Sequence, residues 1–563
     1  MSPQAVDFQS ISQEVAARFL HTVVLFDDQA FINHTALQSK AKKLKKPTRY
    51  DVHIHSASEN PAVAATGPQH KLDAKTLIDL FAEKGLVCSV LVPGKGENSI
   101  PKTVSAARRS DIVVLDWRIH DDDGDVTTSL IGEILRDDGT GERRLRMIAI
   151  YTAEPDLYEV LAKLKNELKS HYPGFSIKEG DFTLTKGPVH IAVFAKEGST
   201  LPSGDRALQK RIVRLRELPK CLIAEFSVVT RSLIGNVALE SLAAVRTNTH
   251  QILMKFRPEL DAAYLTHRAL PDPPEEAELH LIPLVLSEIQ AVLEDRNVSK
   301  QVSLDKITKW LDFRVADGLK LYRKLQMRTK SNARKAMLEI TEKGVRDKTL
   351  PDSYPQIGEL LTRLREESHK SALNDFTKLL ITDGTSALEY DRELALLMSV
   401  RSRYESPTPI LMLGTIIAET IEGAQSKYWL CVQPVCDSVR LKNKRSFPFL
   451  KMSRSQSDAA FNYVVREGSS WVELNLQLRP HQSRLISFKP RAHEQEIRAV
   501  KETNGWYFQS DDPTSKQDPV PKKYRWIADL KTEHAQRVAN DYSTQISRVG
   551  LMESEWLRRW AKK

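Results

Sequence analysis

From residue 21 to about 200, short apolar runs alternate with longer stretches in which apolar positions recur every three to four residues. The apolar runs are rich in β-branched residues, which is typical of strands buried on both faces. They are TVVLF (22–26), LVCSVLV (86–92), DIVVLD (111–116), RMIAIYT (146–152) and HIAVFA (190–195). The stretches between them have helical periodicity, so we expect an α/β domain with a doubly wound, five-stranded parallel sheet.

Three regions are expected along the chain, because this pattern changes twice. Residues 1–204 hold the alternating strands and helices, with an insertion at about 33–72 that contains a basic run and a loose polar stretch. Residues 205–404 have helical periodicity almost throughout, and 233–256 is apolar over more than one face, which indicates a relay or dimer surface. Residues 405–563 contain strand-like runs around turns and end in helix, which predicts a β-rich α+β output module.

The composition is that of a globular protein in a reducing compartment. Of 563 residues, 41% are hydrophobic and 28% are charged, and the length exceeds what one core normally serves. Four cysteines suggest no disulfide framework, and the sequence shows neither a signal peptide nor an apolar run that could cross a bilayer. We therefore expect a cytoplasmic protein without a membrane partner. The net charge of +10 permits an acidic partner such as nucleic acid but does not require one.

Carboxylates follow two of the predicted strands at the point where each strand ends. Asp27 and Asp28 come directly after the first strand, and Asp116 ends the third. In an open parallel sheet, ligands bind outside the carboxyl ends of the strands, so these three carboxylates converge if the two strands are neighbours. A hard divalent cation with oxygen ligands relieves their repulsion most simply, and Mg²⁺ suits a site that also takes a phosphoryl oxygen.

Two further strand ends supply a hydroxyl and a cation. Thr152 ends the fourth strand and Lys196 follows the fifth, so both are expected at the same edge of the sheet. The set suits phosphoryl transfer to Asp116, because a metal ion and a lysine offset charge on the phosphoryl oxygens while a hydroxyl donates a hydrogen bond.

This arrangement resembles the receiver domain of two-component response regulators. VVLFDDQ is similar to the first strand and acid pair of that family, and DIVVLDWRIHDDDGD is similar to its phosphoacceptor strand and loop, including the Asp123-Gly124 pair. YTA is similar to the switch threonine and the alanine after it, and Lys196 to the invariant lysine. The resemblance implies a receiver, flavodoxin-like fold in which Asp116 accepts the phosphoryl group. It also implies that Asp27, Asp28, Asp116 and the backbone carbonyl of Arg118 bind Mg²⁺.

The sequence departs from the family pattern at several positions. The acid pair and the acceptor are 88 residues apart (28 to 116), about twice the usual separation, which the insertion explains. Glu197 follows the lysine where the family usually has proline, and His120 stands where proline is common. The usual switch aromatic is displaced, because Val193 lies three residues before the lysine and Phe194 is its neighbour. The chemical groups are therefore present, while the expected relay is altered.

A basic segment in the C-terminal region leaves two interpretations open. It includes Arg440, Lys442, Lys444 and Arg445, with Phe447, Phe449, Phe461 and Tyr463 interleaved. Basic side chains with exposed aromatics bind nucleic-acid phosphates and bases. Alternatively, the aromatics belong to the core of a β-module whose basic side chains protect its edges, and this second interpretation is preferred.

We therefore expect a response-regulator-like signalling protein that is phosphorylated on Asp116 by a partner histidine kinase or related ATPase and switches its C-terminal module. A bacterial stress or phage-defence system is a loose analogy for its context, and a homodimer is possible. The chain has no independent catalytic motif, so we do not expect an enzyme. An alternative is a nucleic-acid-binding effector with a receiver fold that is not phosphorylated. A phosphatase of related fold is a third class, but Arg118 stands where its second aspartate is needed.

Overall fold

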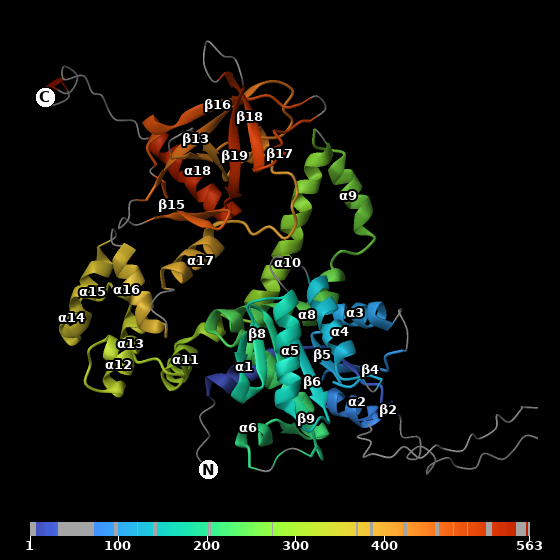
Figure 1. Ribbon diagram of the computed structural model, residues 1–563. Helices are drawn as coiled ribbons and strands as arrows, with labels where there is room; N and C mark the ends of the chain where they lie inside the picture. The colour runs from blue at the N-terminus through green and yellow to red at the C-terminus, as the bar shows by residue number, and fades with distance from the viewer. Residues whose placement is uncertain are drawn as a thin grey trace, which may run out of the picture. The chain divides into compact units, whose positions relative to one another are not determined.

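The computed structural model divides the chain into two compact units, Met1–Phe313 and Arg314–Lys563 (Figure 1). It describes residues 7–31, 72–94, 99–120, 122–138, 144–200, 202, 204–272, 274–366, 370–382, 387–419, 425–455, 461–476, 478–491, 494–513, 521–547 and 559–560. The predicted insertion at 33–72 lies outside the described residues except for Leu72. The predicted helical region, 205–404, is divided between the two units.

The first unit contains the predicted parallel sheet. The five predicted strands are parallel and follow one another in the order β4, β1, β5, β6, β9, which is the 2-1-3-4-5 order of doubly wound flavodoxin-like folds. The strands are β1 (Thr22–Phe26), β4 (Val87–Leu91), β5 (Ile112–Leu115), β6 (Arg146–Thr152) and β9 (Val189–Lys196). The fold class expected from the alternating pattern is therefore confirmed.

The sheet has eight strands, so the expectation of five was wrong. Two strands, β8 (Thr183–Lys186) and β7 (Ser176–Lys178), extend it antiparallel beyond β9, and β10 (Ile212–Val213) pairs parallel with the end of β9. These strands are short and partly exposed, so they lack the continuous apolar run of a strand that is buried on both faces. A separate parallel pair, β2 (Ala30–Phe31) and β3 (Leu72–Asp73), lies between β1 and the next helix in the chain, with β2 before the predicted insertion and β3 at its end.

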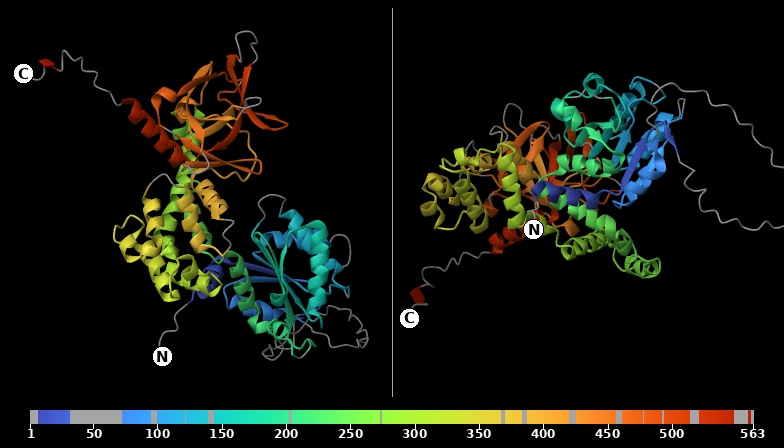
Figure 2. Two further views of the ribbon diagram at one scale, coloured as in Figure 1. Left: turned by 60° about the vertical axis from the view of Figure 1, so that its left-hand side comes forward. Right: turned by 90° about the horizontal axis from the view of Figure 1, so that it is seen from below.

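Helices cover both faces of the sheet (Figures 1 and 2). Within β5, Val113 and Leu115 pack into one apolar layer, whereas Ile112 and Val114 pack into the other. The first layer includes side chains of α3 (Ser99–Arg109), α4 (Asp125–Asp137) and α5 (Leu157–His171). The second includes side chains of α1 (Phe8–Phe19), α2 (Ala74–Ala82) and α7 (Leu218–Thr230). A short helix, α6 (Arg206–Gln209), precedes β10.

The register of the strands brings their carboxyl ends to one edge of the sheet. Phe26 of β1 pairs with Leu115 of β5, and the next residues are Asp27 and Asp116. Leu115 in turn pairs with Ile150 of β6, two residues before Thr152. Thr152 pairs with Ala195 of β9, next to Lys196. The convergence expected from the positions of these residues in the sequence is therefore a consequence of the strand order.

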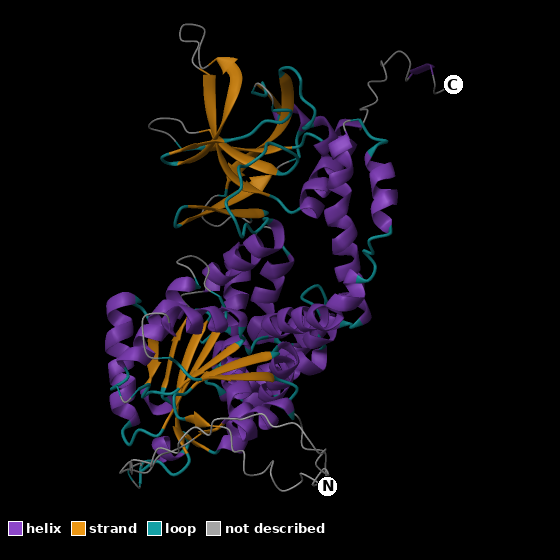
Figure 3. Cartoon of the chain, turned by 90° about the vertical axis from the view of Figure 1, so that its right-hand side faces the viewer, coloured by secondary structure: helices purple, strands orange, loops and turns teal. Residues whose placement is uncertain are grey.

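Among the remaining helices of the first unit, α8 (Leu233–Leu253) packs against α1 and contributes Leu239 to the second apolar layer. The next two helices, α9 (Leu260–Arg268) and α10 (Leu281–Asp295), form an arm that is poorly covered (Figure 3), and α11 (Leu304–Ala316) follows at the boundary between the units. Neither α9 nor α10 has a buried residue. Large apolar side chains are exposed along this arm, at Leu253, Met254, Leu260, Leu265, Leu270, Leu279, Leu281, Ile282, Leu284, Val285 and Leu286.

The second unit begins with helices and continues as a β-rich module, as the sequence predicts. The helices are α12 (Leu321–Lys324), α13 (Lys330–Lys343), α14 (Leu350–Ser353), α15 (Pro355–Arg365), α16 (Lys370–Leu380) and α17 (Ala387–Ser399). A nine-stranded antiparallel sheet follows, in the order β14-β15-β13-β12-β11-β19-β18-β17 with β16 paired to β13. Its strands are β11 (Thr415–Glu419), β12 (Lys427–Cys431), β13 (Arg445–Arg454), β14 (Tyr463–Glu467), β15 (Ser470–Leu476), β16 (Arg484–Phe488), β17 (Val500–Glu502), β18 (Gly505–Pro513) and β19 (Pro521–Asp529). The helix α18 (Thr532–Ser547) comes after the last strand.

Among the described helices, none has the length and apolar character that a membrane crossing requires.

Candidate functional site

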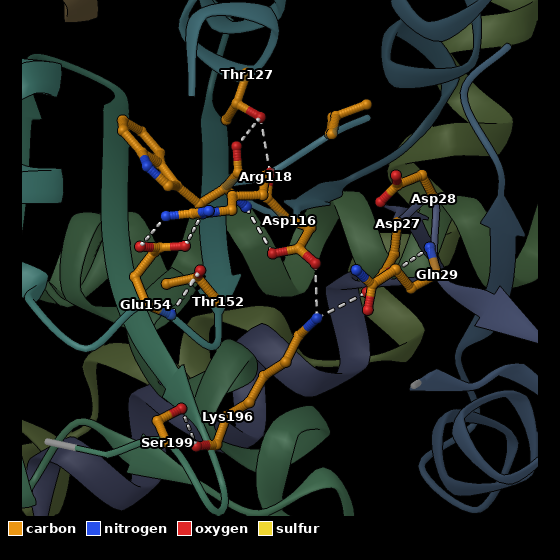
Figure 4. Close-up of polar contacts among 12 residues, drawn as sticks. Asp27, Asp28, Gln29, Asp116, Arg118, Thr127, Thr152, Glu154, Lys196 and Ser199 are labelled. Carbon is orange, nitrogen blue, oxygen red and sulfur yellow. Dashed lines mark hydrogen bonds and ion pairs between the residues drawn. The ribbon is translucent and has the colours of Figure 1, made fainter. Parts of the chain in front are cut away.

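A buried lysine joins two of the predicted carboxylates at the carboxyl edge of the sheet (Figure 4). The Nζ atom of Lys196 lies 2.7 Å from Oδ2 of Asp116 and 2.9 Å from Oδ2 of Asp27. All three side chains are at least nine-tenths buried, so little water competes for these ion pairs. Asp27, Asp116 and Lys196 therefore form one buried polar cluster at this edge of the sheet.

Backbone amides fix the orientation of each carboxylate. Oδ1 of Asp27 accepts a hydrogen bond of 2.8 Å from the N–H of Gln29, and Oδ1 of Asp116 accepts one of 2.7 Å from the N–H of Trp117. Oδ2 of Asp28 accepts one of 2.8 Å from the N–H of His120. The Oδ1 atom of Asp28 is buried and has no hydrogen-bond partner among the described residues.

The geometry of these carboxylates fits a divalent metal ion. One oxygen from each of Asp27, Asp28 and Asp116 can be chosen so that all three lie within 4.8 Å of one another. Oxygen atoms are the ligands that Mg²⁺ prefers, and the unpartnered Oδ1 of Asp28 is available to a ligand that no protein group satisfies. The backbone carbonyl of Arg118, in the loop after Asp116, stays a predicted fourth protein ligand.

Burial and the charges of the cluster perturb the ionisation of Asp116. Burial raises the pKa of Asp116 to about 6, although Lys196 opposes the shift. Burial also acts against the charged form of Lys196, but Asp116 and Asp27 outweigh it and raise the pKa of the lysine. One ammonium group therefore faces three carboxylates, and a further cation would lower the electrostatic free energy of the cluster.

The loop after Asp116 is fixed by packing that the sequence did not reveal. Gly124 has a φ of +86°, and a Cβ atom at this position would lie 2.3 Å from the ring of the buried Trp117. The Oγ1 atom of Thr127 donates hydrogen bonds to the carbonyl oxygens of Asp116 (2.7 Å) and Trp117 (3.1 Å). The family-like Asp-Gly pair thus includes a glycine that the tryptophan requires.

Thr152 lies at the same carboxyl edge of the sheet, beside an ion pair that the sequence also did not predict. Its buried Oγ1 atom accepts a hydrogen bond of 3.1 Å from the N–H of Glu154. The carboxylate of Glu154 binds the guanidinium of Arg118, which stands two residues after Asp116. Figure 4 shows this pair on the side of Asp116 away from Asp27 and Asp28.

Comparison with known protein families gives one match. Residues 19–201 match the model of the response receiver domain. This segment is a receiver domain. It is a divergent one within a larger chain of 563 residues, and it indicates response-regulator-like signalling. No curated protein and no solved structure matches the chain significantly.

The structure explains how this receiver domain departs from its family. Val193, at the usual position of the switch aromatic, belongs to the apolar layer that includes α4 and α5. Phe194 belongs to the opposite layer, where the guanidinium carbon of Arg211 lies 5.2 Å from its ring centroid. The aromatic side chain next to Val193 therefore faces away from the α4 and α5 side. His120 has a φ of +64°, a left-handed conformation that proline cannot adopt.

The basic C-terminal segment does not form the predicted set of exposed aromatics. Phe447, Phe449 and Tyr463 are buried, so they are not available to stack on bases, and that part of the nucleic-acid interpretation was wrong. Lys444 pairs with Asp511 at 2.8 Å, and Arg445 lies 3.6 Å from Asp437. Arg440 is half-buried, Phe461 is half-buried and Lys442 is exposed. The preferred interpretation, a β-module with core aromatics, agrees with these positions.

Proposed function

We propose that Asp116 accepts a phosphoryl group from a partner histidine kinase or related ATPase, and that Mg²⁺ supports the transfer. The observation that carries this proposal is the buried cluster in which Lys196 contacts both Asp116 and Asp27, with Asp28 beside them. A carboxylate held between a fixed ammonium group and a metal-binding acid pair suits a reaction that brings more negative charge into the site.

In the proposed reaction, a carboxylate oxygen of Asp116 attacks the phosphorus atom of the donor. A new O–P bond forms, the P–N bond to a phosphohistidine or the P–O bond to a small donor breaks, and the leaving group keeps the bonding electrons. Lys196 offsets the charge of the phosphoryl oxygens, and the hydroxyl of Thr152 donates a hydrogen bond to one of them. When bound, Mg²⁺ supplies positive charge to the carboxylates and to the phosphoryl oxygens.

Phosphorylation would then control the rest of the chain. In this proposal the chain is a regulator without catalytic activity of its own, and the β-rich module of the second unit is its output. We propose that the partner kinase and this chain act together in a bacterial stress or phage-defence system.

The exposed apolar arm supports a role for the helical region in association. Leu281, Ile282 and Leu286 are 41%, 70% and 57% exposed, and apolar surface of this density is typical of protein–protein interfaces. We propose a homodimer in which α9 and α10 of two copies pack together, because the exposed apolar side chains of the two copies would then bury one another.

Intact-mass spectrometry of the full chain tests the phosphorylation. After incubation with Mg²⁺ and acetyl phosphate, the wild type should gain the mass of one phosphoryl group, and Asp116→Asn should gain none. Asp123→Asn is a matched control, because the Asp123 carboxylate is nearby but 74% exposed, and it should behave as the wild type. A gain of equal size in Asp116→Asn would contradict the proposal.

A further inference from the structure

We propose that Arg118 is a positioning residue that moves from Glu154 to the phosphoryl group on Asp116, and that this exchange of partners carries the signal to the loop between β6 and α5. The inference rests on the proposed phosphorylation of Asp116. It assigns a role to an ion pair that neither the metal site nor the acceptor chemistry requires.

The starting state is a two-point contact between Arg118 and Glu154. The Nε atom of Arg118 donates to Oε1 of Glu154, and its Nη2 atom donates to Oε2 over 3.2 Å. This geometry matches the planar fork of a guanidinium to a carboxylate. The Arg118 side chain is 53% exposed, whereas that of Glu154 is 16% exposed, so the arginine is the partner with room to move.

Both members of the pair lie close to groups that take part in the proposed reaction. Arg118 stands two residues after Asp116, in the loop held by Thr127 and Trp117. The N–H of Glu154 donates a hydrogen bond to Oγ1 of Thr152, the hydroxyl that is predicted to contact the phosphoryl group. Figure 4 shows Arg118, Glu154 and Thr152 together on one side of Asp116.

Phosphorylation changes the charges on which this pair depends. A phosphoryl group brings up to about two negative charges and three strong acceptor oxygens, which compete with Glu154 for the guanidinium. The same charge repels the carboxylate of Glu154. Lys196 is already bound to Asp27 and Asp116, so Arg118 is a second cation for the added charge. As Thr152 turns towards the phosphoryl group, its hydroxyl no longer accepts the hydrogen bond from Glu154.

The exchange of partners removes the contacts that hold Glu154 to Arg118 and Thr152, and so loosens the segment that leads into α5. Asp156 is the N-cap of this helix, where its side chain accepts from the N–H groups of Tyr158 and Glu159. The short connection from Thr152 to Asp156 therefore transmits the loss of both Glu154 contacts to α5. This path does not use an aromatic switch, which suits a chain with Val193 at that position and Phe194 on the opposite face of the sheet.

The test compares the two ways of breaking the pair, in the full chain, with acetyl phosphate and Mg²⁺. Glu154→Gln removes the negative charge that Glu154 presents to Arg118 and so weakens its competition with the phosphoryl group, and the initial rate of phosphorylation should rise about twofold to fivefold, the range that an exposed ion pair supports. Arg118→Gln removes the cation, so the rate should fall by about the same factor. A merely structural pair predicts changes in the same direction for both variants.

Two further measurements make the result decisive. Glu133→Gln and Arg136→Gln break an exposed pair within α4, with a contact of 2.7 Å, and should leave the rate unchanged. Amide hydrogen exchange over residues 153–157 should become faster when the wild type is phosphorylated and should already be fast in Glu154→Gln without phosphorylation. If Glu154→Gln and Arg118→Gln change the initial rate of phosphorylation in the same direction while the wild type is still phosphorylated on Asp116, the exchange of partners is overturned and the proposed function stands. A wild type that takes no phosphoryl group would overturn the proposed function as well.

Discussion

Lys196 lies 80 residues after Asp116 in the sequence, yet its Nζ atom is 2.7 Å from Oδ2 of that carboxylate, and both side chains are buried. A buried ion pair is stabilising only if both charges remain satisfied, because each charge loses its hydration. The second carboxylate on Lys196, that of Asp27, leaves the cluster with more negative than positive charge. The charge balance of the cluster therefore favours an additional cation, which supports the proposed Mg²⁺ site.

Loss of the lysine should expose this imbalance. In Lys196→Met, the carboxylates of Asp27 and Asp116 keep their burial but lose their cation, so the free energy of unfolding at pH 8 should fall by about 3–5 kcal/mol. Saturating Mg²⁺ should restore part of that loss, because the metal ion replaces the missing charge. Urea denaturation with and without Mg²⁺ measures both effects, and an unchanged unfolding midpoint would contradict the role of Lys196 as the counter-ion.

Metal binding should depend on pH through Asp116. Its pKa is raised from 3.8 to about 6, so without metal the carboxyl group is increasingly protonated as the pH falls through about 6. The folded-state pKa of Asp116 lies above the unfolded value, so the contribution of this carboxyl group to the stability of the fold is lost as the pH rises from about 4 to 6. Mg²⁺ competes with the proton and should bind more tightly at pH 7.5 than at pH 5.5.

Tryptophan fluorescence offers a convenient measure of that binding, because Trp117 is buried and its backbone N–H donates a hydrogen bond to the carboxylate of Asp116. Asp116→Asn should weaken Mg²⁺ binding and remove the pH dependence over this range. An affinity that is independent of pH in the wild type would show that the proton and the metal ion do not compete at this carboxyl group.

The close contact between Gly124 and Trp117 predicts a specific cost of substitution. Gly124→Ala places a Cβ atom 2.3 Å from the ring at a φ of +86°, so the chain must bear both the left-handed conformation and a displacement of Trp117. We expect a destabilisation of about 3 kcal/mol or more and a slower phosphorylation, because the loop after Asp116 shifts. Gly187→Ala is the matched control, with a φ of +54° and no atom within 4 Å of the added Cβ, and should cost only about 1–2 kcal/mol. Equal costs for the two variants would show that Trp117 yields without strain.

The proposed dimer makes a separate prediction. Ile282→Asp combined with Leu286→Asp places two charges on the exposed face of α10. In sedimentation velocity, the wild type should sediment as a dimer and this double variant as a monomer. Leu485→Asp serves as the control, since Leu485 is 67% exposed on a strand of the β-rich module and should leave the dimer intact. A wild type that is monomeric at all concentrations would contradict the homodimer.

The sequence was informative where a residue's position along one strand decides its place. Asp27, Asp116, Thr152 and Lys196 each end a strand or follow one directly, so the strand order alone brings them to one edge. The strand β8, which lies between β9 and β7, was missed because a half-buried strand has no continuous apolar run to mark it.

Other features of the site depend on contacts between side chains that no local pattern records. The ion pair of Arg118 with Glu154 joins residues 36 positions apart, and the hydrogen bonds of Thr127 connect α4 to the end of β5. The requirement for glycine at 124 becomes visible only when the Trp117 ring is in place. The basic segment around Lys444 was ambiguous for the same reason, because burial of its aromatics depends on strands far away in the chain.

The most direct test of the central claim is the location of the phosphoryl group. Trypsin releases residues 110–118 as the peptide SDIVVLDWR, which contains Asp116 and, as an internal control, Asp111. Asp111 is held by Arg246 at 3.1 Å and lies at the other end of the strand. Borohydride reduces an acyl phosphate to the alcohol, so tandem mass spectrometry after treatment with Mg²⁺, acetyl phosphate and borohydride should find homoserine at position 116 and unmodified aspartate at 111. An unmodified Asp116 in a chain that has gained phosphoryl mass would show that another residue is the acceptor and would contradict the account.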